Sequence, residues 1–232
     1  MEATWWNFEF KDRITSVGAD AIVALGPLGT AQFPIVRQSN DPNVRSAILS
    51  VTTSFFNQAS VETRGIDFSV DYTHDIGRYG SLNFNLSGTK NLKYDAQAVV
   101  GGPVVDGNGR FYTASPITAI TPNTDLRING RVTWQMDGHN LTAAVRYYGP
   151  IDLYDSQTTL VKLDTVDAWA PIDLSYSYTW DLGGRELQLG VGAQNVFGQE
   201  EPYLMYPSFQ PFIPTLHDTR GRSVYAKASV TF

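Results

Sequence analysis

Residues 62–72 read Glu62-Thr63-Arg64-Gly65-Ile66-Asp67-Phe68-Ser69-Val70-Asp71-Tyr72. From Ile66 onward the apolar residues occupy every second position, and Asp67, Ser69 and Asp71 separate them. Because successive side chains of a strand point to opposite faces, this pattern predicts a strand with one apolar and one polar face.

The same two-residue alternation recurs along the chain. It is found in residues 6–10, 82–86, 126–136, 141–147, 172–180, 187–193 and 224–232. Together with the segment quoted above, these predict about eight strands, so the chain belongs to the all-β class. The polar faces carry arginine, lysine, aspartate and asparagine, which a dry interior could not accommodate without partners.

The connections between these strands alternate in length. Three are short and rich in turn residues, at 73–80, 137–140 and 181–185, and four are long, at 14–47, 90–124, 149–170 and 198–219. Structureless loops of more than about 15 residues are unusual in a compact soluble domain. Long and short connections at opposite ends are typical of an antiparallel transmembrane β-barrel with short periplasmic turns and long extracellular loops. Aromatic residues close to the short turns, Tyr72, Trp134 and Trp180, fit an interfacial girdle.

Composition and motifs exclude several functions. The 17 Lys and Arg against 23 Asp and Glu give a net charge of -6, which argues against a nucleic-acid partner. There is no cysteine, and the three histidines are scattered. No nucleophile elbow, phosphate loop or metal-ligand spacing is present. The sequence therefore predicts no enzyme, no metal site and no cofactor.

Three segments together resemble a known family. Residues 62–72, the stretch Gly192-Ala193-Gln194-Asn195-Val196-Phe197-Gly198, and the closing strand 221–232 resemble the barrels of TonB-dependent outer-membrane receptors. The resemblance implies a bacterial outer-membrane location and TonB-energised uptake of a scarce nutrient such as a ferric siderophore. It implies that residues 1–232 are the C-terminal portion of a 22-stranded barrel, with the plug domain and the N-terminal strands absent.

The implied partners follow from that resemblance. They are membrane lipid, the plug and remaining strands of the full receptor, the TonB complex through the missing N-terminal part, and the barrel-assembly machinery. Eight strands can also close alone, so the alternative is a small autonomous outer-membrane barrel acting as an adhesin or structural anchor. A soluble β-sandwich is a third interpretation, and it predicts that the chain stays monodisperse without detergent.

The candidate site residues fall into three groups, each with two interpretations. Phe232 and Val230 end an alternating strand and resemble a barrel-assembly signal, although a hydrophobic end can be incidental. The aromatics Tyr203, Tyr206, Phe209 and Phe212 lie among prolines in the last long loop, where they could contact a ligand or, as we favour, pack against neighbouring loops. The predicted lumen-facing arginines are Arg127, Arg131 and Arg146, which could bind an anionic chelate but are more simply expected to pair with an acidic plug surface.

Overall fold

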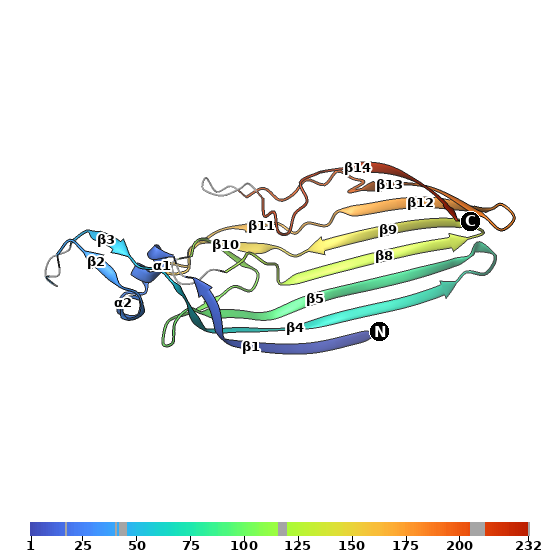
Figure 1. The fold of residues 1–232 in the computed structure, drawn as a ribbon. Helices are drawn as coiled ribbons and strands as arrows, with labels where there is room; N and C mark the ends of the chain where they lie inside the picture. Colours follow the sequence, from blue (N-terminus) through green and yellow to red (C-terminus); the bar gives the residue numbers. More distant parts are fainter. Residues whose placement is uncertain (17, 40, 42–45, 116–119, 205–211, 232) are drawn as a thin grey trace.

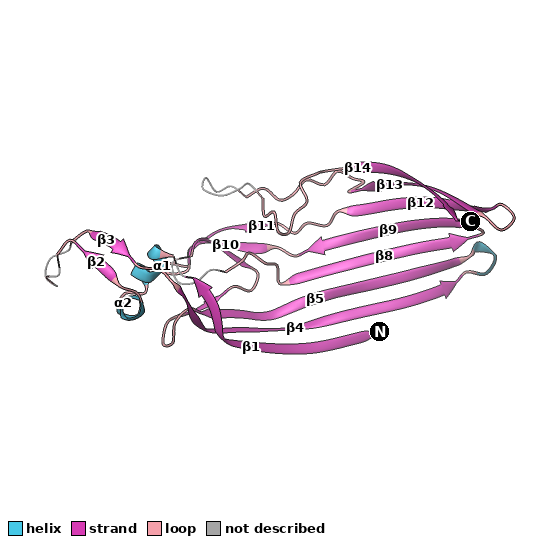
Figure 2. Cartoon of the chain, viewed as in Figure 1, coloured by secondary structure: helices cyan, strands magenta, loops and turns pink. Residues whose placement is uncertain are grey.

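The computed structural model describes residues 1–16, 18–39, 41, 46–115, 120–204 and 212–231. Figure 1 shows a long, twisted sheet with a layer of smaller elements at one end and tight turns at the other. Figure 2 shows that the helices are confined to the turns and to an arm at the far end of that layer. The all-β prediction is confirmed.

The elements follow one another in this order: β1 Glu2–Ser16, α1 Ala19–Ala24, α2 Pro27–Gln32, β2 Ile35–Arg37, β3 Ile48–Val51, β4 Phe55–Asp75, η1 Gly77–Tyr79, β5 Ser81–Gln97, β6 Val104–Asp106, β7 Arg110–Ala114, β8 Leu126–Met136, β9 His139–Tyr148, β10 Ile151–Ser156, β11 Lys162–Val166, β12 Ile172–Asp181, β13 Glu186–Gln194 and β14 Ser223–Thr231. Every one of the eight segments predicted from alternation lies within a strand or overlaps one.

The main sheet is an antiparallel meander. Its path runs β1-β4-β5-β8-β9-β12-β13-β14, and β6 adds to the end of β5. The strands of this path are neighbours both in sequence order and in space, as expected of an up-and-down barrel wall. Their register fixes which side chains share a face, because directly opposed residues of two paired strands point the same way.

The short turns join β4 to β5, β8 to β9 and β12 to β13. Between β8 and β9 the two turn residues Asp137 and Gly138 both have positive φ, at 45° and 84°, which is the conformation favoured in two-residue hairpins. A Cβ on Gly138 would lie 2.6 Å from the carbonyl oxygen of Thr179. This glycine is therefore required both by the turn and by the close approach of β12.

The sequence pattern predicts four irregular long connections, but three of them carry regular elements. The first carries α1, α2 and the β2–β3 hairpin, and the second and third contribute β7, β10 and β11 to a separate three-stranded sheet. Two clusters of buried apolar residues hold this loop layer together. One contains Phe111, Ile151, Leu153, Val166, Leu204, Ile213 and Leu216, and the other contains Leu25, Ala98, Val99, Val105 and Tyr112. The core of the chain thus lies in the loop layer, not on either face of the long sheet.

The sheet does not close within the described residues. β1 pairs with β4 and β14 pairs with β13, and neither edge strand pairs with the other. Closure between first and last strands is what a small autonomous barrel requires, so this structure does not support that alternative. No helix among the described residues is long and apolar enough to cross a membrane.

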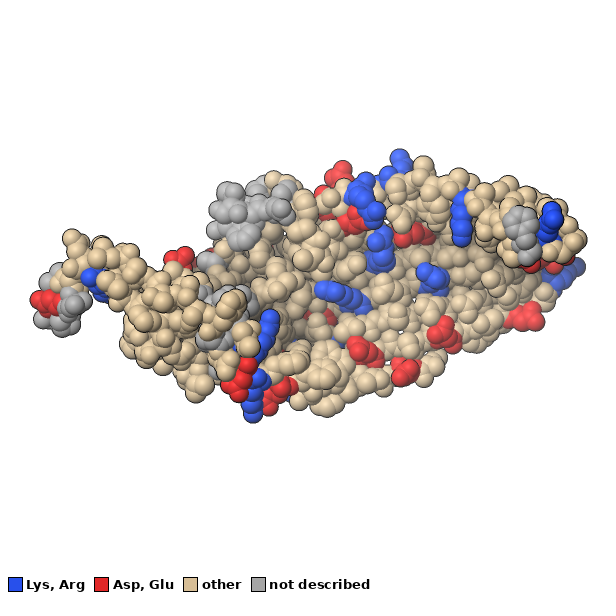
Figure 3. Space-filling model, in the orientation of Figure 1, with Lys and Arg blue, Asp and Glu red and all other residues tan. Residues whose placement is uncertain are grey.

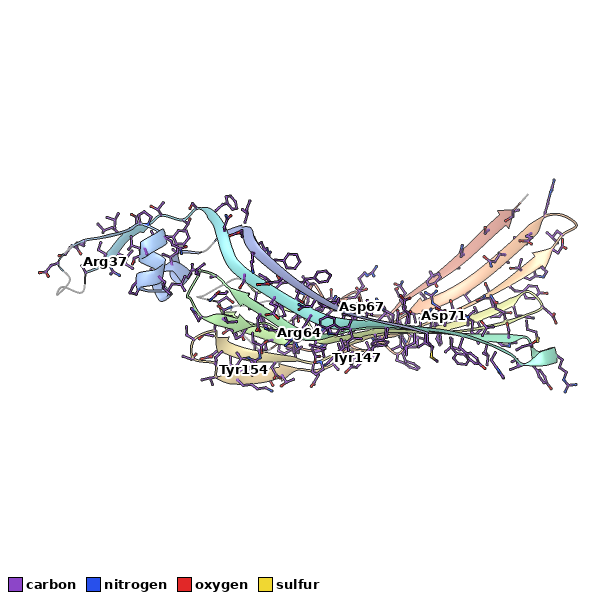
Figure 4. The ribbon with its side chains drawn as sticks, turned by 90° about the horizontal axis from the view of Figure 1, so that it is seen from below. Arg37, Arg64, Asp67, Asp71, Tyr147 and Tyr154 are labelled. Atoms are coloured by element: carbon purple, nitrogen blue, oxygen red, sulfur yellow. The ribbon has the colours of Figure 1, made fainter. Side chains whose placement is uncertain are left out.

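The sheet is curved, and its two faces differ in chemistry. In Figure 4 β1 and the β12–β14 end rise on the same side, where Asp67 and Asp71 lie, while Arg64 and Tyr147 lie on the opposite side. We call the first side the concave face and the second the convex face. Figure 3 shows acidic and basic side chains spread along the hollow of the sheet. Over most of its length, therefore, the wall is polar inside the curve and apolar outside it.

Candidate functional site

The concave face carries polar rungs that cross several strands. In one rung Asp67, Thr89 and Arg127 stand directly opposite one another on β4, β5 and β8, and in the next but one Asp71, Asn85 and Arg131 do so. Thr89 Oγ1 donates to Asp67 Oδ1 at 2.7 Å, and Asn85 Nδ2 donates to Asp71 Oδ1 at 2.8 Å. These two rungs thus have a carboxylate on β4, a neutral donor on β5 and a guanidinium on β8.

All three predicted arginines lie on this concave face, but their surroundings differ. Arg146 pairs with Asp173, with 3.3 Å between Nη2 and Oδ1, and the same carboxylate oxygen accepts the backbone N–H of Asn195 at 2.8 Å. The guanidinium of Arg127 lies 5.9 Å from the ring centroid of Tyr148. Arg131 is exposed and forms no ion pair with the described residues. Of the three arginines, Arg131 is therefore the one with neither an ion pair nor a cation–π contact among the described residues.

A register break divides the wall into two parts. Gly65 pairs with Asn91 but the preceding residue, Arg64, pairs with Lys93, so Leu92 of β5 is an inserted residue. Such an extra residue is a β-bulge, and it exchanges the faces of everything beyond it on its own strand. The general pattern of apolar outside and polar inside, expected from the sequence, fails beyond this point.

Beyond the bulge the convex face becomes ionic. Arg64 lies on that face (Figure 4), and Lys93 stands directly opposite it on β5. The Lys93 ammonium bridges two carboxylates, with Nζ 2.6 Å from Glu62 and 3.2 Å from Asp95. A nearby ion pair joins Lys90 to Asp125. Charges of this kind belong in water or among polar headgroups, not in a hydrocarbon layer.

At the same height the concave face becomes aromatic. Trp6 stands opposite Gly65, two residues beyond the Thr4–Asp67 pair of the polar face, so Trp6, Phe8 and Phe10 share that face. We call these three residues the aromatic strip. Their rings are stacked in sequence, with centroids 5.6 Å apart for the first pair and 6.2 Å for the second. The side chains of Phe8 and Phe10 are 52% and 50% exposed, so nothing in the described chain covers them fully.

A cavity of about 470 Å³ lies at the upper end of the aromatic strip. Its lining combines the rings of Phe10 and Tyr94 with Val61, the neutral polar residues Thr63, Asn91 and Asn123, and one cation, Arg13. In a regular strand Phe10 and Arg13 would point to opposite faces. Asp12 between them has a left-handed backbone, with φ of 55°, and this break in the alternation lets both side chains line one cavity.

The last long loop is anchored to its neighbours. Leu204, Ile213 and Leu216 are buried against side chains of β7, β10 and β11. Of the predicted aromatics, Tyr203 is 70% exposed and Phe212 is half-buried. Tyr206 and Phe209 lie outside the described residues.

Two titratable groups of the same loop have displaced pKa values. Arg220 donates to Asp218 through Nε at 2.9 Å and Nη2 at 2.6 Å, and this hydrogen bonding lowers the pKa of Asp218 to about 2. Burial lowers the pKa of His217, whose ring packs edge-on against the fully buried Trp169 with 5.6 Å between centroids. These contacts hold the loop in place.

The closing strand places Val230 on the convex face, opposite Leu187 of β13, and its side chain is 51% exposed. Phe232 lies outside the described residues. Among the described residues no group of three or more His, Asp or Glu side chains is arranged to hold a metal ion.

Sequence reasoning missed the aromatic strip as a site. The alternation of Trp6, Phe8 and Phe10 with Asn7, Glu9 and Lys11 predicts a strand but not the side of the wall to which the rings point. Leu92 gives no local signal either, because it continues the even-numbered apolar positions of its strand, Leu82, Phe84 and Leu86.

Comparisons with known proteins agree with this architecture. A family model described as TonB dependent receptor-like, beta-barrel matches residues 1–196. A mutant of the ferric enterobactin receptor (PfeA) from Pseudomonas aeruginosa has a similar structure, with a TM-score of 0.55 and 18% identity over 98% of this chain and 28% of that receptor. The siderophore receptor PirA from Acinetobacter baumannii gives a TM-score of 0.51 and 13% identity, again over 98% and 28% of the two chains.

At these identities the structural likeness shows the fold. A comparison with curated proteins gave no match. The chain spans about 28% of the length of the two receptors it resembles, and the likeness therefore concerns part of a barrel wall and its loops.

Proposed function

The chain belongs to the TonB-dependent receptor family, whose members are non-enzymatic transporters of the outer membrane, and we propose on this basis that it serves the TonB-energised uptake of a scarce nutrient such as a ferric siderophore. It supplies part of the wall and of the extracellular loops. The structurally similar proteins named as ferric enterobactin and siderophore receptors support this choice of cargo.

The open eight-stranded meander is the observation that carries the proposal. Short turns lie at one end, a packed loop layer lies at the other, and the two edge strands are free. An exposed edge strand is an unpaired row of N–H and C=O groups, which is costly in a bilayer. Further strands must therefore complete the wall, and a 22-stranded barrel of which residues 1–232 are the C-terminal portion meets this need.

The proposed partners follow from the two faces. Lipid contacts the apolar convex face, and a plug domain fills the space enclosed by the polar concave face. We assign Arg131, and to a lesser degree Arg127, to ion pairs with acidic groups of that plug, since these two are not neutralised within the described chain. Arg146 already has Asp173, so its role is to fix the wall.

The two ends of the molecule have separate roles in this proposal. Phe232 and Val230 close the barrel strand that the assembly machinery recognises. Tyr203, Tyr206, Phe209 and Phe212 belong to an extracellular loop that packs against its neighbours and forms the rim of the entrance. TonB contacts the plug-bearing part of the receptor, not this segment.

The experiment is deletion of the reading frame in the source bacterium, followed by uptake of radiolabelled ferric chelates under iron limitation. A panel of catecholate, hydroxamate and carboxylate chelates with haem and cobalamin as further cargoes separates the substrate classes. Loss of uptake of one cargo, restored by the intact gene, supports the proposal. Unchanged uptake of every cargo, with the protein present in the outer membrane of the parent strain, would refute it.

A further inference from the structure

His217 is a histidine buried in the loop layer. Its side chain is 7% exposed, and it ends a turn formed by residues 213–217, which we call the His217 turn. In this turn the backbone N–H groups of Leu216 and His217 donate to the carbonyl oxygen of Ile213 at 3.0 and 2.9 Å. The side chains of Ile213 and Leu216 are buried in the apolar cluster shared with β7, β10 and β11. The turn is therefore docked on the loop layer by three buried side chains.

The contacts of the imidazole ring require its neutral form. The backbone N–H of Ile213 donates to Nδ1 of His217 at 3.4 Å, and this hydrogen bond is buried. A ring nitrogen can accept only when it carries no proton, and both nitrogens of a protonated imidazole are donors. The ring also packs edge-on against the buried Trp169. Protonation would therefore set two N–H groups against each other and place a charge among buried apolar side chains, which is costly.

The charged groups around the ring do not offset this cost. The Glu201 carboxylate favours the protonated ring, but burial outweighs it and lowers the pKa of His217. Other charged side chains of the surrounding elements already have partners: Asp218 with Arg220, Arg146 with Asp173, Arg110 with Asp106, Asp152 with Lys162, and Asp155 with Thr159. Asp164 and Asp167 are exposed. The neutral ring is thus the form that fits the docked turn.

We propose that the His217 turn is a pH-sensitive latch of the loop layer, docked against Trp169 while the ring is neutral and released when the ring takes up a proton. This rests on the proposed function in one respect, because that function places the loop layer outside the cell, where it meets the pH of the medium. Release uncovers Trp169 and the apolar side chains of Ile213 and Leu216.

Linkage gives the direction and the limits of the response. A histidine with a lowered pKa in the docked state stabilises docking fully above its ordinary value of 6.5, and this stabilisation is lost as the pH falls through the lowered pKa. One proton changes the equilibrium by at most about tenfold per pH unit. Between pH 7.5 and 5, release should therefore increase by about threefold to about thirtyfold.

The test measures the accessibility of the turn in the full 232-residue chain, folded in zwitterionic detergent micelles. The chain has no cysteine, so Leu216→Cys places a single thiol in the buried part of the turn, and Thr215→Cys places one at an exposed position beside it. A methanethiosulfonate reagent labels each chain. The labelling rate of the Leu216→Cys chain divided by that of the Thr215→Cys chain cancels the pH dependence of the thiol itself. We expect this ratio to rise by about threefold to about thirtyfold between pH 7.5 and 5.

Variants made in both cysteine backgrounds locate the proton. His217→Gln keeps a hydrogen-bond acceptor but cannot titrate, so its ratio should change by less than about twofold over this range. The matched control is His139→Gln, at a short turn of the same chain, which should keep the full response. Glu201→Gln removes the carboxylate that favours the protonated ring, so release should require a lower pH. This variant keeps the imidazole and tests the latch even where His217→Gln leaves the turn undocked.

The outcomes separate this inference from the proposed function. A parent ratio that does not change with pH, an undiminished response in His217→Gln, or loss of the response in folded His139→Gln would each overturn the inference. A ratio that falls on acidification would overturn it too, because the protonated ring would then be held by the face of Trp169. If uptake of ferric chelates depends on the gene while the ratio ignores pH, only the inference fails. If the ratio responds as expected while deletion leaves all uptake intact, only the proposed function fails.

Discussion

The pairing of β4 with β1 depends on Gly65, which stands opposite Trp6. Replacing Gly65 by alanine therefore gives a quantitative test of the structure. A Cβ at this position would lie 2.5 Å from Cζ2 of Trp6 and 2.6 Å from the carbonyl oxygen of Lys90. The Trp6 ring could swing aside, but the carbonyl is backbone of the adjacent strand and can move only with it. Overpacking of this kind costs about 1–3 kcal/mol.

Gly130 provides the matched control. It lies in β8 of the same sheet, and an added Cβ would meet only methyl groups, Val145 Cγ1 at 3.0 Å and Leu86 Cδ1 at 3.8 Å. Replacing glycine by alanine inside a regular element stabilises it by about 0.5–1 kcal/mol through the unfolded chain. This gain applies at both sites, so the overpacking at Gly65 should set the two variants apart by about 1–3 kcal/mol.

The assay is urea unfolding of the chain in micelles, followed by tryptophan fluorescence and by gel mobility without heating. We expect Gly65→Ala to be the less stable variant and to show altered Trp6 emission, because the ring loses its seat against the glycine. A Gly65→Ala chain as stable as Gly130→Ala, with unchanged emission, would mean that β1 does not pair with β4 in the register described. The assignment of the aromatic strip to the concave face would then fall as well.

Two further predictions address the faces and the loop layer. Val132→Arg, on the convex face of β8, should lower the stability of the chain in lipid vesicles by about 2–4 kcal/mol, whereas Thr133→Arg, one residue on and on the concave face, should change it by less than about 1 kcal/mol; equal losses would contradict the orientation of the wall. The pKa of Asp218 is about 2 in the folded chain and about 3.9 in an unfolded one, so its pairing with Arg220 stabilises the fold above about pH 4 and this contribution disappears as the pH falls through 2. Urea titrations at a series of pH values should show the parent chain more stable than Asp218→Asn near neutrality, with the difference shrinking below about pH 4; a difference that grows on acidification would give the wrong sign.

The strands could be predicted because their cause is local and repeated. In residues 66–72, for example, every second side chain must meet lipid or a partner on the same face, so the period of two is written directly into the sequence. The connections are different. β7 and β10 pair in parallel, and their paired residues Ala114 and Ser156 lie 42 residues apart in the sequence. No local pattern specifies such a pairing. The loop layer therefore looked irregular although its buried residues form the core.

The concave position of the aromatic strip could not be predicted for a related reason. Alternation shows that Trp6, Phe8 and Phe10 share a face, but only pairing with β4 shows which face it is. That pairing is set by Gly65 opposite Trp6, and the change of polarity on β5 is set by the single inserted residue Leu92. A shift of one residue in the pairing moves every side chain of a strand to the other face. The face on which the rings lie therefore depends on the register, and the sequence pattern does not specify the register.

The position of the bulge has a physical explanation in the thickness of the bilayer. A tilted transmembrane strand needs about 9–11 residues, and β8 and β9 have 11 and 10. β4 and β5 have 21 and 17, so about half of each lies outside the hydrocarbon.

Counted from the short turn that joins them, residues 75 to 66 of β4 and 81 to 90 of β5 make one span, and the bulge at Gly65 and Leu92 follows directly. Above that level the convex face meets water or headgroups, which permits Arg64 and Lys93 there, and the concave face is free to become apolar. The bulge therefore marks the height at which the wall leaves the hydrocarbon layer, and the aromatic strip lies beyond that height.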